Sequence, residues 1–115
     1  MPFSNLITLD IIETMEAFVE RKRPPLEIRD KVDLGYKIEG KSIYIFEIRP
    51  RWNNPEIINK LPVAKATYVI AKKEWKVYWM RSNGKWYLYD PQLVIKDVAQ
   101  FIKLVEEDAY HCFWG

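Results

Sequence analysis

The strongest constraint on the fold is the segment from Tyr68 to Tyr89, where aromatic and basic residues interleave in a predicted hairpin. Seven aromatic residues stand there among five lysines and arginines. A hairpin that covers a core normally hides its rings on one face and shows polar groups on the other. This pattern predicts rings on both faces, so either two layers cover the sheet or one face is a binding surface.

Apolar residues recur at helical spacing near both ends of the chain. In the first such stretch they are Leu9, Ile12, Met15, Phe18 and Val19. We therefore predict a helix over residues 5–22, which Pro24 and Pro25 end because proline cannot continue a helix. The same spacing near the other end predicts a second amphipathic helix over residues 97–107.

Between the helices, short runs rich in β-branched and aromatic residues predict strands. These runs are residues 31–38, 42–49, 63–71, 75–81 and 85–89. For the first two strands we predict a three-residue loop from Glu39 to Lys41, with Gly40 at positive φ. An odd loop length aligns Leu34 and Tyr36 with Tyr44, Phe46 and Ile48 on a single apolar face.

The last two strands meet at Asn83-Gly84, the dipeptide typical of a two-residue type I′ hairpin turn. Such a turn would set Arg81 opposite Trp86 on one face of the hairpin. In the long connection over residues 50–62, Asn54 before proline predicts one or two turns of helix. Together the elements predict an α+β fold, 1–115 being a single domain. It has a mostly antiparallel sheet of about five strands, with an N-terminal and a C-terminal helix packed on one face.

Composition and charge narrow the classes of function. The single cysteine, Cys112, cannot form an internal disulfide. The N-terminal residues lack the pattern of a signal peptide, and no apolar run could span a bilayer, so we expect a cytoplasmic protein without a membrane partner. Residues 31–90 hold twelve basic and six acidic residues, a local charge of +6 in a chain of net charge +2. A basic centre of this kind is compatible with a polyanionic partner.

Four segments together resemble a known family: DLGYKIEGKSIYIFEIRPRW, PVAKATYV, EWKVYWMRSNGKWYLYDP and EEDAYHCFWG. They resemble the uncharacterised bacterial domain-of-unknown-function family numbered 3024, over nearly the whole chain. The resemblance implies a small bacterial single-domain protein that is cytoplasmic. It implies no activity and assigns no role to any residue.

One enzymatic alternative centres on Asp33 and Glu47, which the predicted register places on one face. Restriction-type nucleases hold Mg²⁺ between carboxylates on neighbouring strands, beside a positive group that Lys65 would supply here. Arg49 stands where that chemistry needs a lysine, and an arginine cannot act as a base near neutral pH. A cross-strand charge ladder explains the same residues without catalysis.

The C-terminal tail, AYHCFWG, raises the question of a metal site. Asp108, His111 and Cys112 lie within five residues, which is a poor match to zinc-ligand spacing, so we expect no metal and no cofactor. Two large rings at 113 and 114 would gain more from burial than their ordering costs. We therefore predict that the tail packs back on the domain and that Cys112 is a packed thiol.

The remaining pattern combines exposed aromatic rings with cations, as in sheets that bind single-stranded nucleic acid. The predicted ligand-binding residues are Arg49, Arg51, Trp52, Lys65, Lys76, Arg81 and Trp86. We favour a non-enzymatic binding module, with nucleic acid as the first-guess ligand and a protein partner as the other option. A structural alternative is a homodimer whose interface buries Tyr78, Tyr87 and Tyr89 between two chains.

Overall fold

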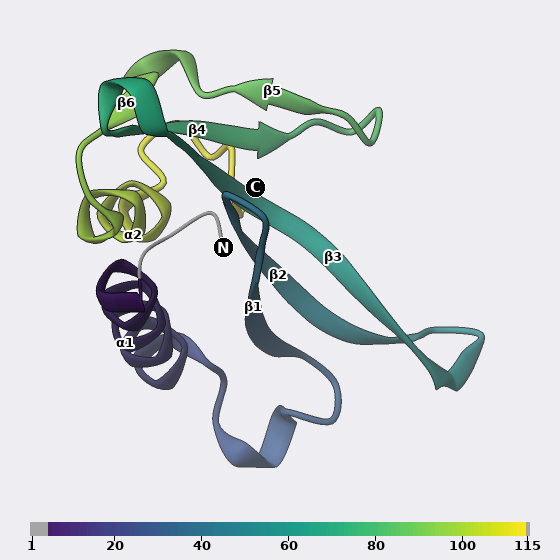
Figure 1. Cartoon of the computed structure of the whole chain (residues 1–115). Helices are drawn as coiled ribbons and strands as arrows, with labels where there is room; N and C mark the ends of the chain where they lie inside the picture. The colour runs from purple at the N-terminus through teal and green to yellow at the C-terminus, as the bar shows by residue number, and fades with distance from the viewer. Residues whose placement is uncertain (1–4, 115) are drawn as a thin grey trace.

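Two helices cover one face of an antiparallel sheet in the structure, a computed structural model that describes residues 5–114 (Figure 1). The helices are α1 (Asn5–Lys22) and α2 (Val98–Glu107), and short 3-10 turns lie at η1 (Leu26–Ile28), η2 (Ile70–Lys72) and η3 (Asp90–Gln92). The strands are β1 (Asp33–Glu39), β2 (Ser42–Arg51), β3 (Asn54–Val69), β4 (Glu74–Met80), β5 (Trp86–Leu88) and β6 (Val94–Ile95). The predicted α+β class and both terminal helices are confirmed.

The sheet is a meander in which β1 to β5 lie side by side in sequence order. The sixth strand, β6, pairs with β4 and was not predicted, because two residues are too short to carry a recognisable pattern. β5 and β6 share one edge of β4, with β5 opposite its C-terminal half and β6 opposite Trp75 and Lys76. Within the described residues, no helix is long and apolar enough to cross a membrane.

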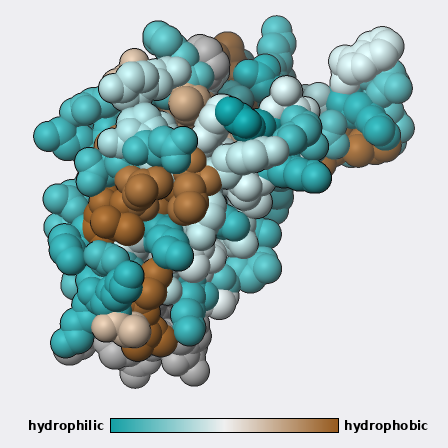
Figure 2. Space-filling view, turned by 90° about the horizontal axis from the view of Figure 1, so that it is seen from above, coloured by the Kyte–Doolittle hydropathy of each residue, from teal (hydrophilic) through white to brown (hydrophobic). Residues whose placement is uncertain are grey.

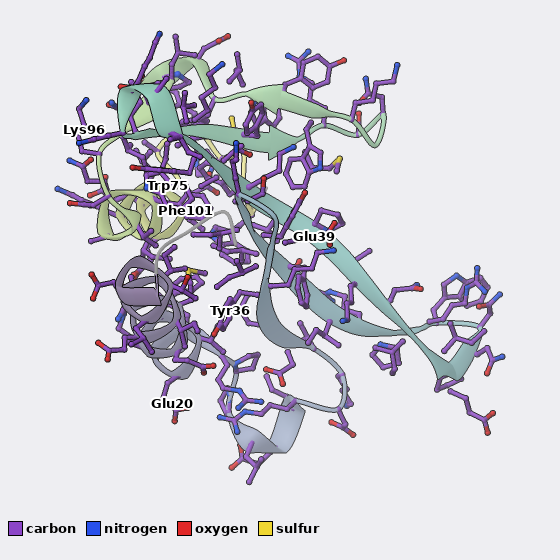
Figure 3. The ribbon with its side chains drawn as sticks, viewed as in Figure 1. Glu20, Tyr36, Glu39, Trp75, Lys96 and Phe101 are labelled. Atoms are coloured by element: carbon purple, nitrogen blue, oxygen red, sulfur yellow. The ribbon has the colours of Figure 1, made fainter. Side chains whose placement is uncertain are left out.

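The hydrophobic core lies between the sheet and the two helices. Figure 3 shows Tyr36, Trp75 and Phe101 in this layer, from β1, β4 and α2 respectively. Ile11, Met15 and Phe18 of α1 are buried there, whereas Leu9 and Ile12, which belong to the apolar stripe read from the sequence, are exposed. The face of α1 that packs against the core is therefore rotated around the helix axis relative to the predicted apolar face.

At the edge of this core a tyrosine of β1 joins α1 to the sheet. The Tyr36 hydroxyl donates a hydrogen bond of 2.9 Å to the Glu16 carboxylate. Burial, helped by this carboxylate, raises the pKa of Tyr36 to about 12. The tyrosine is therefore held neutral, with its polar end satisfied at the rim of an apolar layer.

The first hairpin corrects the predicted register. Glu39 pairs with Ser42, so the loop is the two residues Gly40 and Lys41, and Gly40 has φ +60° as expected of the first position of a type II′ turn. Because the loop is one residue shorter than predicted, the faces exchange: Ile43 and Ile45 face the core, and Tyr44, Phe46 and Ile48 face away. The run from Ile43 to Ile48 is apolar on both faces except at Glu47, so the sequence alone does not show which face of the strand is turned to the core.

A glycine makes this register possible. Gly35 lies opposite Phe46, and a Cβ atom built on Gly35 would stand 2.7 Å from the Phe46 ring. The Phe46 ring therefore lies directly over the β1 backbone, where a larger residue would displace it. This packing holds one large ring against the face that the helices do not cover.

The last hairpin is also shifted by one residue. Its loop is Ser82–Gly84: the Arg81 N–H donates to the Lys85 carbonyl at 3.1 Å, and the Gly84 N–H donates to the Arg81 carbonyl at 2.9 Å. Gly84 alone in this loop has positive φ, +78°, and the Asn83 side chain accepts a hydrogen bond from the Lys85 N–H at 3.0 Å. This is a three-residue loop with a glycine bulge, so the predicted two-residue type I′ turn is wrong.

Residues 49–62 form an extended arm, and the helix predicted after Asn54 in the connection over residues 50–62 is wrong. β2 and β3 pair out to Arg51 and Asn54, so only Trp52 and Asn53 form the turn. The β-branched Ile57 and Ile58 favour strand, and a helix of one or two turns would have had no face to bury. Figure 1 shows the resulting hairpin projecting away from the helices.

The C-terminal tail packs back on the domain, as predicted, but of its two last rings only Phe113 is buried, and Trp114 stays 40% exposed. Asp108 ends α2 in a left-handed conformation and its carboxylate accepts the backbone N–H groups of Phe113 and Trp114, both at 3.0 Å. The Phe113 ring lies 4.8 Å from the buried Tyr89 ring. Cys112 is a half-buried thiol beside this core, and burial raises its pKa. The packed thiol that was predicted is confirmed.

Candidate nucleic-acid interface

The face of the sheet away from the helices carries aromatic rings and lysines on neighbouring strands. We call it the open face and define it by Lys37, Tyr44, Phe46, Lys60, Lys65, Tyr78 and Trp86. Tyr44 pairs with Lys65, which in turn pairs with Tyr78. Three adjacent strands thus place a lysine between two tyrosines, and β5 adds Trp86 beside them.

The Lys65 ammonium lies among three rings. Its Nζ is 4.5 Å from the centre of the Tyr78 ring, 5.2 Å from that of Trp86 and 5.9 Å from that of Tyr44. These distances are within the range of cation–π attraction. Burial among the rings lowers the pKa of Lys65. No carboxylate among residues 5–114 forms an ion pair with it.

Two further lysines lie over rings on the same face. Lys37 Nζ is 4.9 Å from the Tyr44 ring centre, and Lys60 Nζ is 5.1 Å from the Phe46 ring centre. Lys37 also pairs with Glu39 at 3.1 Å, whereas Lys60 has no carboxylate partner within the described part of the chain. The open face therefore combines these two exposed lysines with the half-buried rings of Tyr44, Tyr78 and Trp86 and with the buried ring of Phe46.

A pocket of ≈ 400 Å³ lies at the α1 side of the molecule, but the open face has its own hollow of ≈ 270 Å³. The latter is lined by Tyr44, Phe46 and Trp86, together with Lys37, Lys60 and Pro62. The Tyr44 and Trp86 ring centres are 6.1 Å apart, with their planes tilted by 55°. A ligand pocket usually measures about 300–1,000 Å³, so this hollow is near the lower limit of that range and has room for one flat ring.

The predicted ligand-binding residues fall into three groups. Lys65 and Trp86 belong to the open face, and Lys76 points to the same side of the sheet two residues before Tyr78. Arg49, Arg51 and Trp52 lie on the arm. Arg81 stands apart from both groups.

Arg81 lies over the Trp79 and Tyr87 rings, at 5.0 and 4.5 Å, on the helix side of the sheet. The prediction that Arg81 and Trp86 share a face is wrong, because the longer loop pairs Met80 with Trp86.

The sequence did not identify Lys37, Tyr44, Phe46, Lys60 or Tyr78 as parts of this face. The predicted register had turned Tyr44 and Phe46 into the core, and Lys60 lay in the predicted helix. Tyr44, Phe46 and Ile48 alternate with Ile43 and Ile45 along β2. An even number of residues in the hairpin loop would have assigned the first set to the open face and the second to the core.

The nuclease-like arrangement is not assembled. Asp33 pairs with Ile48, one position from the Leu34–Glu47 pair, so the two carboxylates point to opposite faces. Asp33 instead accepts two hydrogen bonds from Arg23, at 2.6 and 3.2 Å, which hold the pKa of its carboxyl below the usual range. The predicted common face for Asp33 and Glu47 is therefore wrong.

Glu47 binds Arg49 at 3.1 Å, and Lys65 is on the other face of the sheet from this pair. Among residues 5–114, no group of three or more histidine, cysteine or acidic side chains could hold a metal ion. Asp108 accepts backbone hydrogen bonds in the tail instead.

The tyrosines predicted for a dimer interface do not share a surface. Tyr78 is on the open face, whereas Tyr87 pairs with Trp79 on the other face. Tyr89 is buried inside the chain against Phe113.

A family model described as Domain of unknown function (DUF3024) matches residues 3–115. The chain belongs to this family. A search of curated proteins and a search of solved structures each found no match. A functional argument for this DUF3024 chain therefore starts from the geometry of its open face.

Proposed function

We propose that this chain is a non-enzymatic module that binds single-stranded nucleic acid on its open face. The observation that supports the proposal is the Lys65 ammonium set among the rings of Tyr44, Tyr78 and Trp86. Nucleic-acid bases offer flat π faces, and each nucleotide carries one negative phosphate. A surface on which rings and cations alternate at contact distance matches both groups at once.

Stacking on the rings would supply sequence-independent affinity. Tyr44 and Trp86 border the hollow on the open face, so a base entering it contacts both rings. Stacking of a base on an aromatic side chain contributes about 1–3 kcal/mol. Because any base has a π face, this term favours single strands, whose bases are free to turn toward the sheet.

The lysines would supply the attraction to phosphate. Lys60, Lys65 and Lys76 form no ion pair with a carboxylate of the described residues. Their charges are therefore available to a ligand. Each phosphate neutralised on a single strand contributes about 0.7 to the slope of log K against log salt concentration.

The test is fluorescence anisotropy with labelled single-stranded RNA and DNA at low and moderate salt. We expect salt-dependent binding, and a loss of affinity of about 5- to 150-fold for Trp86→Ala, corresponding to one stacked base. Tyr110→Ala is the matched aromatic control, since Tyr110 is exposed in the tail, away from the open face.

The contribution of the lysine charges is tested by comparing the salt dependence of binding for two variants, Lys60→Ala and the control Lys103→Ala. Lys103 is an exposed lysine of α2, so its removal lowers the net charge equally without touching the open face. We expect only Lys60→Ala to lower the salt slope, by about 0.7. Absence of binding at low salt, or binding that salt does not weaken, would refute the proposal.

A further inference from the structure

The arm formed by β2 and β3 reaches beyond every other strand. β1 pairs with β2 only as far as Ile48, and β4 pairs with β3 only from Ala64 onward. Residues 49–62 therefore form a two-stranded ribbon with both outer edges free (Figure 1). The principal extents of the molecule, 45 × 30 × 24 Å, include this projection.

A tryptophan stands at the tip of the arm. The Trp52 side chain is 92% exposed, and its neighbours in the turn are Arg51, Asn53 and Asn54. Figure 2 shows the tip standing clear of the body, with hydrophobic side chains next to hydrophilic ones. A tryptophan offers up to about 250 Å² of surface for burial, so its ring is a strong contact for a ligand that reaches the tip.

Cations lie on both sides of the ribbon. Ile48 pairs with Lys60 and the next pair is Arg49 with Asn59, so Lys60 and Arg49 point to opposite faces. Lys60 continues the open face outward, over the Phe46 ring. On the other side, a cleft of ≈ 520 Å³ is lined by Lys31, Arg49, Arg51, Trp52 and Asn59, with other uncharged residues.

No carboxylate lines that cleft among the described residues, although Glu47 pairs with Arg49 nearby. Lys31 and Arg51 form no ion pair with a described carboxylate. The charge on this side of the arm is thus complementary to a polyanion, as it is on the open face. A single strand lying on the open face would leave the cleft and the Trp52 ring unused.

We infer that the arm is a wedge that recognises the fork where a nucleic-acid duplex opens into two single strands. The Trp52 ring stacks on the last base pair, because it is the only large aromatic surface at the tip within residues 5–114. One strand passes over Lys60 to the open face, and the other passes along the cleft beside Lys31 and Arg51. This inference rests on the proposed single-strand binding and names the form of nucleic acid that the chain prefers.

The experiment compares three labelled DNAs of matched length by anisotropy: a single strand, a blunt duplex and a duplex ending in two unpaired arms. We expect the wild-type chain to bind the forked DNA at least tenfold more tightly than either of the other two. Trp52→Ala should bring the affinity for the fork to that for the single strand and leave single-strand affinity unchanged. Trp52→Phe, which keeps a stacking ring, should retain most of the preference.

The contrary outcomes are distinct. Equal affinity for the fork and the single strand, or a fork preference that Trp52→Ala does not change, overturns the wedge while the proposed function stands. Absence of binding to all three DNAs refutes the proposed function together with the wedge. A chain that light scattering shows to be a dimer, and that Trp52→Ala converts to a monomer, assigns the arm to self-association and also overturns the wedge. Circular dichroism of Trp52→Ala should match the wild type, since the side chain is in solvent.

Discussion

The two faces of the sheet use the same strands for opposite purposes. The face toward the helices presents Ile43, Ile45, Ala64, Ala66 and Val77, all fully buried. The open face presents tyrosines, a tryptophan and lysines in the alternate positions of the same strands. On the covered face the side chains are aliphatic and closely buried, whereas on the open face each large ring lies within about 6 Å of a lysine ammonium.

This difference shows how a sheet can be rich in rings on both sides with helices on only one. Lysine ammonium groups lie over the open-face rings, so part of each ring is covered without a second layer. Such a cover is removable, because a lysine can turn toward a ligand while a packed helix cannot. The covered face should therefore control stability, and the open face should control binding.

The largest expected effect is on the covered face. Phe101 of α2 is fully buried against this face. Replacing it with alanine should lower the free energy of unfolding by about 3–5 kcal/mol, because burial is lost and a cavity is left behind. Leu88→Ala is the open-face counterpart, since Leu88 is exposed at 42%, and should cost less than about 1 kcal/mol. Urea denaturation of both variants measures the contrast. Similar losses would mean that the open face is also packed, for example against a second chain.

An intermediate effect is expected at the start of β1, where Arg23 hydrogen bonds to Asp33. The pair holds the pKa of Asp33 below its value in the unfolded chain, about 3.9, so its contribution is present above that pH. It is lost as the pH falls through the lower pKa of the folded state. Asp33→Asn should lower Tm by several degrees at pH 7, and the difference from wild type should shrink below about pH 4.

Thermal unfolding of the two proteins at a series of pH values measures this difference directly. Asp30→Asn is the control, since Asp30 is an exposed carboxylate that forms no ion pair with a described residue. A Tm difference that persists unchanged at low pH would show that the ion pair is not its source.

The smallest effect on stability is expected at Lys65. Lys65→Met keeps a flexible stem among the rings of Tyr44, Tyr78 and Trp86 but removes the charge. The loss of cation–π attraction, about 0.5–1 kcal/mol at a partly exposed site, is offset because no charge is desolvated. We expect the unfolding free energy to change by less than about 1 kcal/mol, and affinity for single strands to fall. An unchanged affinity would contradict a binding role for Lys65 and would show that this lysine serves only to cover the rings.

Much of the architecture could be predicted because helical periodicity and caps are local. α1 was predicted at its observed bounds, and Asp97 caps α2 by accepting a hydrogen bond from the Gln100 N–H. Hairpin parity could not be predicted in the same way. Asn83-Gly84 fits a two-residue turn, but the same glycine also fits the bulge of a three-residue loop, and the Asn83 side chain favours the latter by bonding Lys85.

The errors in the two predicted hairpin loops also affected the prediction of the candidate site. Lys65 and Trp86 were identified from residue type alone, and the structure places the Lys65 ammonium 5.2 Å from the centre of the Trp86 ring. Tyr44 and Phe46 were missed because a one-residue error in a loop moves every side chain of a strand to the other face. The arm was missed because Asn54 before Pro55 is a good helix start, and only pairing with β2, a tertiary contact, makes it a strand.

The hydrogen-bonded ion pair between Arg21 of α1 and Glu106 of α2 joins residues 85 positions apart. A ribosome adds about 5–20 residues per second, so roughly 4–17 s separate the synthesis of these two residues. During that interval Ile11, Met15 and Phe18 have been made but α2 has not. The apolar side chains of α1 therefore wait several seconds for their partners on α2, and closure of the core must follow the emergence of α2 from the exit tunnel.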